Sequence, residues 1–188
     1  MSYDPTTGKR KKDINTWLHA SIPDYNFKNC FFGQHLIYQQ PDKPIAIVES
    51  EKTAIIASFF MPQYNWLATG GSSGCKWREY QVYNVLQGKE IVLFPDFGYY
   101  NRPQSKPKEE WKTCYEEWLE RAEGIGEKLS CKISVSRILE NNLLETEREI
   151  GPDLADFLIK QDPGTGIALT DEDYPAIWDY KPLTKSNA

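Results

Sequence analysis

The stretch IAIVESEKTAIIASFF, residues 45–60, decides the fold, because it joins an apolar run to a helical pattern through a carboxylate. Residues 45–48 are continuously apolar and rich in β-branched side chains, which is typical of a strand buried on both faces of a parallel sheet. Ser50 is a good helix N-cap and Glu51 suits the positive end of a helix dipole, so a helix is predicted to follow. Glu49 lies between the two elements, either as a solvated cap or as a working acid at the carboxyl edge of the sheet.

Three further short apolar runs follow, and each is bounded by turn residues. They are NWLATGG at residues 65–71, Ile91–Phe94 and Lys132–Val135. Apolar residues from Trp111 to Ala122 recur at three- and four-residue steps, which predicts an amphipathic helix that ends at Gly124 and Gly126. A short helix is predicted at residues 153–160. This alternation predicts an α/β fold with a mainly parallel four-stranded sheet flanked by helices.

The length of 188 residues suits one α/β domain with additions at its ends. We expect residues 1–44 to be a partly irregular N-terminal extension packed on the core. The α/β domain is expected over residues 45–160, followed by a C-terminal tail at 161–188. No apolar run approaches the ~20 residues that span a bilayer, so we expect a cytoplasmic protein with no membrane partner.

The charge and the cysteines exclude further classes of protein. The net charge of −5 does not favour a general nucleic-acid coat, because such binding depends on Lys and Arg that neutralise phosphates. The cysteines, Cys30, Cys75, Cys114 and Cys131, are widely spaced and form no CxxC pair. Structural zinc sites have closely spaced ligands, so we expect no zinc in this chain and no disulfide.

Ligands of open α/β sheets bind beyond the carboxyl ends of the strands. The residues predicted there are Glu49–Lys52, Thr69–Gly74 and Asp96–Gly98. Mg²⁺ prefers a few carboxylate oxygens and keeps waters that phosphates can replace, and Glu49 and Asp96 have that character. Each feature has a plainer interpretation, since Glu49 alone suits a solvated cap and GGSSG suits an ordinary tight turn. The phosphate-binding pattern GxxxxGK[ST] is absent.

The order of these pieces resembles the Toprim domain of bacterial primases and topoisomerases. AIVESEKTA (46–54) is similar to the Toprim motif VVEGEKDA, with Ser50 in place of the usual glycine, and LATGG (67–71) is similar to its second strand end. LFPDFG (93–98) is similar to the Asp-x-Asp motif, although Gly98 stands where the second aspartate belongs. The resemblance covers residues 45–159 and looks closer still to Toprim-like, primase-associated proteins of bacterial mobile elements.

The resemblance implies roles for several residues. Glu49 would be the general acid or base, and Asp96 would bind Mg²⁺ weakly, because one carboxylate ligand is missing. GPDLADFL (151–158) resembles the DxxD helix of primase-like members, which makes Asp153 and Asp156 additional acidic candidates. The candidates for binding phosphate or nucleic acid at the same rim are Lys52, Gly70 and Gly71.

Three functions remain open at this point. The first is a Toprim-like, primase-related nucleotidyl transferase that acts in DNA replication of a mobile element. The alternative is a catalytically inactive Toprim-like module that binds a nucleotide, nucleic acid or a replication partner. A second alternative is a small-molecule phosphotransferase or phosphohydrolase. The expected partners are single-stranded DNA or a nucleotide, and a zinc-binding module or helicase of the same element, of which this chain would be one part.

Overall fold

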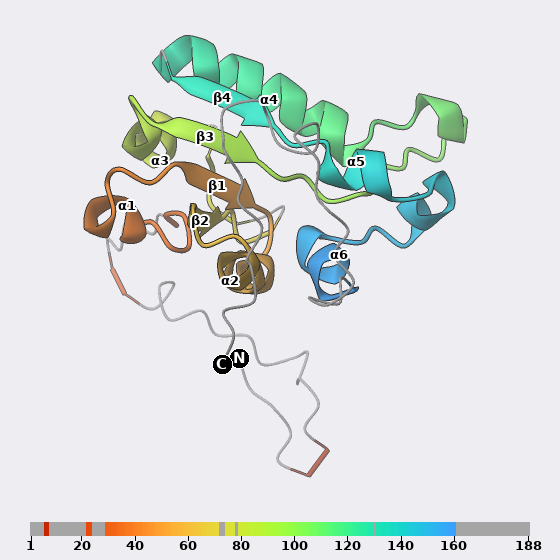
Figure 1. Ribbon diagram of the computed structural model, residues 1–188. Coiled ribbons are helices and arrows are strands. Elements are labelled where there is room, and N and C mark those ends of the chain that lie inside the picture. The colour runs from red at the N-terminus through yellow and green to blue at the C-terminus, as the bar shows by residue number, and fades with distance from the viewer. Residues whose placement is uncertain are drawn as a thin grey trace, which may run out of the picture.

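The computed structural model describes residues 6–7, 22–23, 29–71, 74–77, 79–129 and 131–160. Its strands are β1 (Ile45–Val48), β2 (Asn65–Ala68), β3 (Glu90–Leu93) and β4 (Lys132–Val135). They form one sheet in the order β2-β1-β3-β4, and all three pairs of neighbours are parallel (Figure 1). The sheet confirms the predicted α/β fold, whereas the predicted tail at 161–188 lies outside the described residues.

Strand β1 lies between β2 and β3 and is fully buried along its length. A polar side chain here would find no water and few partners, which explains why residues 45–48 are continuously apolar. Ile45 aligns with Asn65 of β2 and with Ile91 of β3. Strand β3 begins at Glu90, one residue before the predicted run, and the backbone N–H of Phe94 still donates to Ile47 (2.9 Å).

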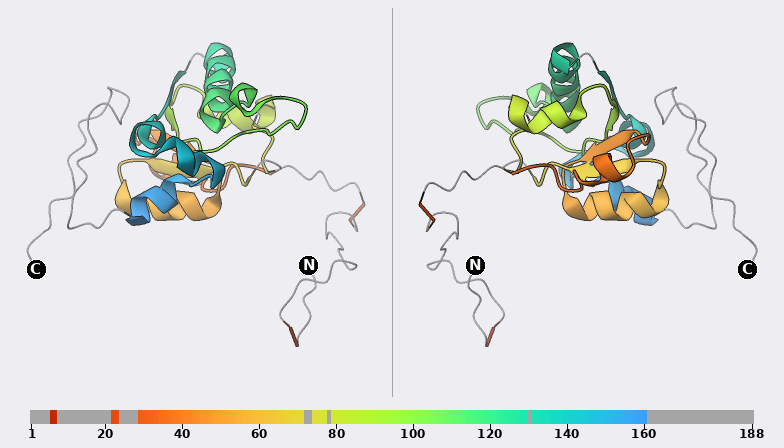
Figure 2. Two further views of the ribbon diagram at one scale, coloured as in Figure 1. Left: turned by 90° about the vertical axis from the view of Figure 1, so that its right-hand side faces the viewer. Right: turned by 90° about the vertical axis from the view of Figure 1, so that its left-hand side faces the viewer.

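Helices cover both faces of the sheet (Figures 1 and 2). One face carries α2 (Glu51–Phe60), α5 (Ile138–Asn142) and α6 (Leu154–Lys160), and the other carries α1 (Leu36–Gln39), α3 (Tyr80–Tyr83) and α4 (Cys114–Leu129). Side chains of β1 alternate between the two cores, with Ala46 and Val48 on the α2 side and Ile45 and Ile47 on the α4 side. Short 3₁₀ helices are η2 (Asn84–Leu86), η3 (Lys108–Glu110) and η4 (Glu145–Glu149). Among the described residues, no helix is long and apolar enough to cross a membrane.

Helix α4 begins later than the apolar pattern predicts. Thr113 and Glu116 cap it reciprocally, since the Thr113 hydroxyl accepts from the backbone N–H of Glu116 (3.1 Å) and the Glu116 carboxylate accepts from that of Thr113 (2.8 Å). This capping box satisfies two backbone donors that a helix start leaves unpaired. The helix therefore starts at Cys114, and Trp111 lies outside it.

The prediction that Gly124 and Gly126 end this helix is wrong, because α4 continues to Leu129. A glycine inside a helix costs about 1 kcal/mol relative to alanine. Ile125 and Leu129 are buried in the core on this face of the sheet, and burial of each such side chain stabilises by about 1.5–3 kcal/mol. Tertiary packing thus outweighs the local preference of the two glycines.

The described part of the N-terminal extension packs on the core. Phe31 is fully buried, and Phe32 exchanges two backbone hydrogen bonds with Ala68 at the end of β2 (3.0 and 3.2 Å). Ile37 of α1 adds to the core on the α4 side. Most of residues 1–28 lie outside the described part, so their predicted irregularity stays a prediction.

Successive strands are added to one side of β1 first and to its other side afterwards, so the strand order reverses between β1 and β3. The chain passes from β1 to its neighbour β2 on one side, and then returns across β1 to form β3 on the other. In open α/β sheets, this is where a crevice for ligands forms outside the carboxyl ends of the strands. Glu49 follows β1 directly and Asp96 follows β3, so both acids flank this point.

Candidate functional site

A cavity of about 770 Å³ lies at the carboxyl ends of β1, β2 and β3. Glu49, Gly71 and Asp96 all line it, so the fold brings together residues from all three predicted strand-end loops. The lining continues through Gly98, Tyr99, Tyr100 and Arg102 of the segment after β3, and through Cys114, Trp118 and Arg121 of α4. Pockets of about 300–1,000 Å³ hold most small ligands, so the cavity has room for a nucleotide.

The glycine pair after β2 fixes the backbone at Glu49. The amide N–H groups of Gly70 and Gly71 both donate to the carbonyl oxygen of Glu49, at 2.9 and 3.0 Å. The hydroxyl of Thr69 donates to the same oxygen at 3.3 Å. Both glycines have left-handed φ angles, +79° and +84°, which other residues rarely adopt. The pair thus positions Glu49, a role that the sequence did not predict, while phosphate binding by the pair stays a prediction.

Asp96 carries the most perturbed carboxyl group at the cavity. Burial is the largest cause that raises the pKa of Asp96, and the negative charges of Glu49, Asp153 and Asp156 raise it further. The positive charge of Lys52 lowers it, and the resulting pKa is about 7. An unperturbed aspartate titrates near pH ~3.9. A half-buried carboxyl group with mainly acidic neighbours is costly to ionise, so it favours binding a cation or holding a proton.

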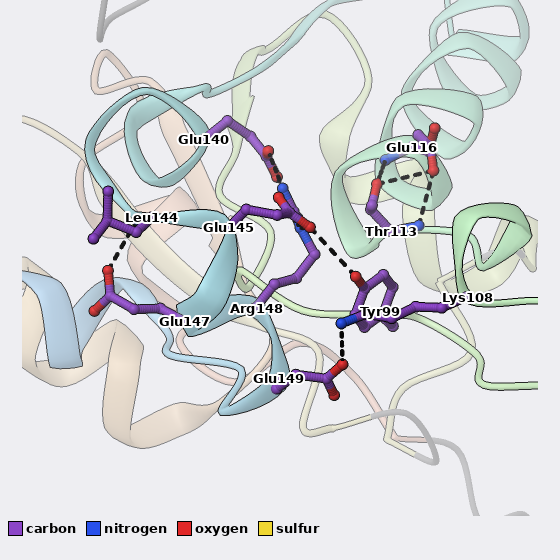
Figure 3. A network of polar contacts seen from close by, with 10 residues as sticks. All are labelled: Tyr99, Lys108, Thr113, Glu116, Glu140, Leu144, Glu145, Glu147, Arg148 and Glu149. Carbon is purple, nitrogen blue, oxygen red and sulfur yellow. Dashed lines mark hydrogen bonds and ion pairs between the residues drawn. The ribbon is translucent and has the colours of Figure 1, made fainter.

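A buried arginine holds the loop that follows β3 (Figure 3). The guanidinium of Arg148 lies over the ring of Phe97, 4.0 Å from its centroid. It donates two hydrogen bonds to Glu140 (3.1 and 2.8 Å) and reaches both carboxylate oxygens of Glu145 at 2.9 Å. The hydroxyl of Tyr99 donates to the same Glu145 at 3.3 Å. Residues on both sides of Gly98 are therefore tied to one cluster of charges, which preorganises the loop.

Gly98 stands where the resemblance places a second aspartate. A Cβ added to Gly98 would lie 3.5 Å from the Cα of Gly151 and 3.8 Å from the Sγ of Cys114, which are ordinary van der Waals distances. The fold therefore has room for a Cβ at this position. Burial raises the pKa of the Cys114 thiol to about 12, with further contributions from Asp96 and Glu49. A thiol that stays protonated is a poor nucleophile, so we assign no catalytic role to Cys114.

Lys52, Asp153 and Asp156 form a separate cluster, and none of them is among the described residues that line the cavity. Asp153 accepts a hydrogen bond from the hydroxyl of Thr53 (2.6 Å), and its carboxylate lies 3.0 Å from Nζ of Lys52. Each of the two aspartates also accepts from the backbone N–H of the other, at 2.8 and 3.1 Å, which caps α6. Burial disfavours the charged form of Asp153, but these hydrogen bonds hold its pKa below the usual value.

The aromatic and cationic residues of the cavity were not predicted. Tyr99, Tyr100 and Arg102 follow directly after Asp96–Gly98, so a predicted strand-end loop longer by four residues would have included them. Arg121 belongs to the helix that we predicted, three residues after Trp118 and seven after Cys114. Residues at this spacing lie on one face of a helix, and that face lines the cavity.

The donor set of the cavity fits one kind of metal site. In the described part of the chain, no three His, Cys, Asp or Glu side chains come together as a group that could hold a metal ion. Glu49 and Asp96 supply two carboxylates at one cavity, and Mg²⁺ is commonly bound by one or two carboxylates, waters and substrate phosphates. The set fits Mg²⁺ shared with a phosphate ligand, and it does not fit a cage made of protein alone.

The comparisons with known proteins give one match. Residues 1–97 match the protein family described as "Domain of unknown function (DUF6371)", and since this is more than half of the chain, the chain belongs to that family. The matched region includes Glu49, the glycine pair and Asp96, and it ends before Tyr99 and α4. No curated protein and no solved structure matches the chain.

Proposed function

We propose that this member of the DUF6371 family acts on a nucleotide or a nucleic-acid strand by Mg²⁺-dependent phosphoryl transfer at the cavity. The observation that carries the proposal is that Glu49 and Asp96 line one cavity at the reversal of strand order, where the charge of Glu49 helps to raise the pKa of Asp96. The resemblance to Toprim domains supports the same assignment. A role in replication of a mobile element belongs to the proposal on that resemblance alone.

In this proposal Asp96 and Glu49 would hold Mg²⁺ together with phosphate oxygens of the ligand. The ion would offset negative charge on the phosphate during transfer. The resemblance gives Glu49 the role in proton transfer, and three donors, the amides of Gly70 and Gly71 and the hydroxyl of Thr69, fix its backbone where it lines the cavity. Asp96 is held by the loop that Arg148 organises, so both acids are preorganised before a ligand enters.

The pKa of Asp96 adds a pH dependence to this binding. A carboxyl group must lose its proton before it can bind a metal ion, so Mg²⁺ affinity should rise with pH until the proton is lost, near pH 7. Binding of Mg²⁺ should also release a proton below that pH. An exposed aspartate would show neither effect in this range, because it is ionised already above pH ~5.

A second function is favoured by a different observation. The described residues contain no group of three metal-binding side chains, and Asp153 and Asp156 are occupied in capping α6. If these acids do not move to the cavity, two carboxylates alone hold Mg²⁺ weakly. The chain would then be a binding module for nucleotides or nucleic acid without transferase activity.

The variant Glu49→Gln separates the two functions, because it keeps the shape of the side chain and removes the charge. Primer synthesis on a single-stranded template with Mg²⁺ and nucleoside triphosphates measures transfer. We expect transfer to fall at least about 100-fold, the usual range for loss of a general acid or base. Glu127→Gln, the same change at an exposed position of α4, is the matched control and should leave transfer unchanged. Absence of any Mg²⁺-dependent transfer by the unmodified chain would leave the binding module as the function.

A further inference from the structure

Tyr100 is an aromatic residue that lines the cavity and is held by several contacts although it is exposed. Tyr100 is 43% exposed, and it is a lining residue of the cavity that contains Glu49 and Asp96. Its backbone N–H donates to the carbonyl of Lys112 at 2.9 Å. Its hydroxyl accepts a hydrogen bond from Arg121 at 3.1 Å, and the guanidinium of Arg121 lies 5.2 Å from the centre of its ring.

Arg121 is itself fixed from two further sides. Its Nε donates to Glu117 at 2.8 Å, and its guanidinium lies 5.4 Å from the ring centre of the buried Trp77. Glu117 is buried between Arg121 and Lys112, and burial alone would raise its pKa, yet the hydrogen bonds from these two cations lower it. Contacts to Trp77 and Glu117 thus fix the guanidinium of Arg121, and Arg121 in turn holds the ring and the hydroxyl of Tyr100, which lines the cavity.

Two exposed cations line the same cavity. The side chain of Arg102 is 47% exposed and pairs with Glu149 at 3.5 Å, while Lys76 is 77% exposed and pairs with Glu79 at 3.6 Å. Exposed ion pairs of this kind contribute about 0–1 kcal/mol, so a phosphate can replace either carboxylate at little cost. Proteins bind unpaired nucleotides with aromatic rings, on which the bases stack, and with neighbouring cationic side chains, which contact the phosphates.

We propose that Tyr100 is a stacking platform for an unpaired nucleobase, and that Arg102 and Lys76 contact the phosphates of the same ligand. The inference rests on the proposed function and specifies its ligand as a free nucleotide or a single strand, not a duplex. In a duplex the faces of the bases are covered by their neighbours, so a ring at the cavity has nothing to stack on unless a base is unpaired.

Fluorescence anisotropy with a labelled 12-residue oligodeoxynucleotide, alone and as a duplex, tests the inference, and unlabelled ATP is added as a competitor. We expect Tyr100→Ala to weaken single-strand binding about tenfold, because stacking on one aromatic ring contributes that much or more. Tyr100→Phe keeps the ring and should bind within about twofold of the unmodified chain. Tyr38→Ala, which removes another exposed tyrosine that is not among the residues lining the cavity, is the matched control. Thermal melts of all variants confirm that they fold.

The phosphate contacts of Arg102 and Lys76 are tested separately, by the dependence of affinity on salt concentration. Arg102→Ala and Lys76→Ala should each reduce the slope of log affinity against log salt concentration by about 0.7, the value for one phosphate contact on a single strand. Tyr100→Ala should leave that slope unchanged. Competition by ATP that depends on Tyr100 identifies a free nucleotide as the ligand, whereas its absence with intact strand binding identifies the strand.

Several results overturn the inference. They are equal affinity of Tyr100→Ala and the unmodified chain, equal or tighter binding of the duplex, and no binding of either the single strand or ATP. The assay of Mg²⁺-dependent phosphoryl transfer distinguishes this failure from failure of the proposed function. If Tyr100→Ala changes nothing while Mg²⁺-dependent transfer persists, only the stacking inference fails. If stacking is lost in Tyr100→Ala but no form of the chain transfers phosphoryl groups, only the catalytic function fails.

Discussion

Two aspartates near the carboxyl edge of this sheet, Asp96 and Asp153, have pKa values that shift in opposite directions. Asp153 has a lowered pKa, because hydrogen bonds from Thr53, the backbone of Asp156 and Lys52 outweigh its burial. Asp96 has a raised pKa of about 7, because burial and mainly negative neighbours act on it together. A carboxylate whose charge is stabilised by hydrogen bonds within the protein stabilises the fold. A carboxylate whose charge lacks such partners is available to bind a ligand.

The comparison predicts that removal of the two carboxylates changes stability in opposite directions. Asp153→Ala removes the acceptor of three hydrogen bonds and the cap of α6, so we expect a loss of about 3 kcal/mol in the free energy of unfolding. Urea denaturation at pH 7 measures it. Asp42→Ala, at an exposed loop position, is the control and should change stability by less than about 0.5 kcal/mol. A loss below about 1 kcal/mol for Asp153→Ala would remove its structural role.

Asp96→Asn should instead stabilise the chain by about 2–4 kcal/mol at pH 8 without Mg²⁺, because each pKa unit corresponds to about 1.4 kcal/mol. A group whose pKa is raised by folding contributes stability below its unfolded pKa and loses it as the pH rises through its folded value. For Asp96 this window runs from about pH 4 to about pH 7. The difference between the variant and the unmodified chain should therefore disappear near pH 3. Urea denaturation of both across this range tests the sign, and an equal or lower stability of Asp96→Asn at pH 8 would contradict it.

Gly98→Asp would add a third carboxylate to the cavity that Glu49 and Asp96 line. The Cβ fits, because its nearest neighbours would lie at 3.5 Å or more. Without metal the extra negative charge should destabilise the chain, and with Mg²⁺ the added ligand should tighten binding about tenfold. Calorimetric titration with Mg²⁺ measures the change. Unchanged or weaker Mg²⁺ binding in a folded Gly98→Asp would show that this position does not correspond to the second acid of a Toprim motif.

Lys52→Met should have the smallest effect. The Lys52 side chain is 56% exposed, and hydrogen bonding to Asp153, opposed by a little burial, raises its pKa. Exposed pairs contribute about 0–1 kcal/mol, so we expect a loss below about 1 kcal/mol that 0.5 M salt reduces further. Single-strand affinity of this variant tests the predicted phosphate role independently. A drop of more than about threefold would support that role in addition to the pairing with Asp153.

The fold and the two acids were predictable because strong local signals specify them. Four apolar residues before Glu49 predict β1, and the N-cap residue Ser50 predicts the start of α2. The Ser50 hydroxyl does accept a hydrogen bond from the backbone N–H of Thr53 (3.5 Å). Parallel strands then place Glu49 and Asp96 at one edge without further information. The end of α4 was missed because burial of Ile125, distant in sequence from its partners, outweighs its glycine neighbours.

The rest of the candidate site depends on contacts that no local pattern contains. The amides of Gly70 and Gly71 could have faced a ligand or the chain, and only the parallel pairing of β1 with β2 directs them to the Glu49 carbonyl. Tyr100 and Arg121 are 21 residues apart, so their hydrogen bond exists only in the folded chain. The sequence also could not predict the opposite pKa shifts of Asp96 and Asp153, because these depend on what surrounds each aspartate in the fold.

The central claim is that Glu49 and Asp96 form a Mg²⁺ site that a phosphate ligand completes. Calorimetric titration of Mg²⁺ at pH 8 into the unmodified chain and into Asp96→Asn, each with and without a single-stranded 12-residue oligodeoxynucleotide, tests it most directly. The account predicts weak binding by the unmodified chain alone, binding at least about tenfold tighter with the oligonucleotide, and no binding to the Asp96→Asn variant. Mg²⁺ binding that is absent from every form, or equal in the unmodified chain and Asp96→Asn, would contradict it.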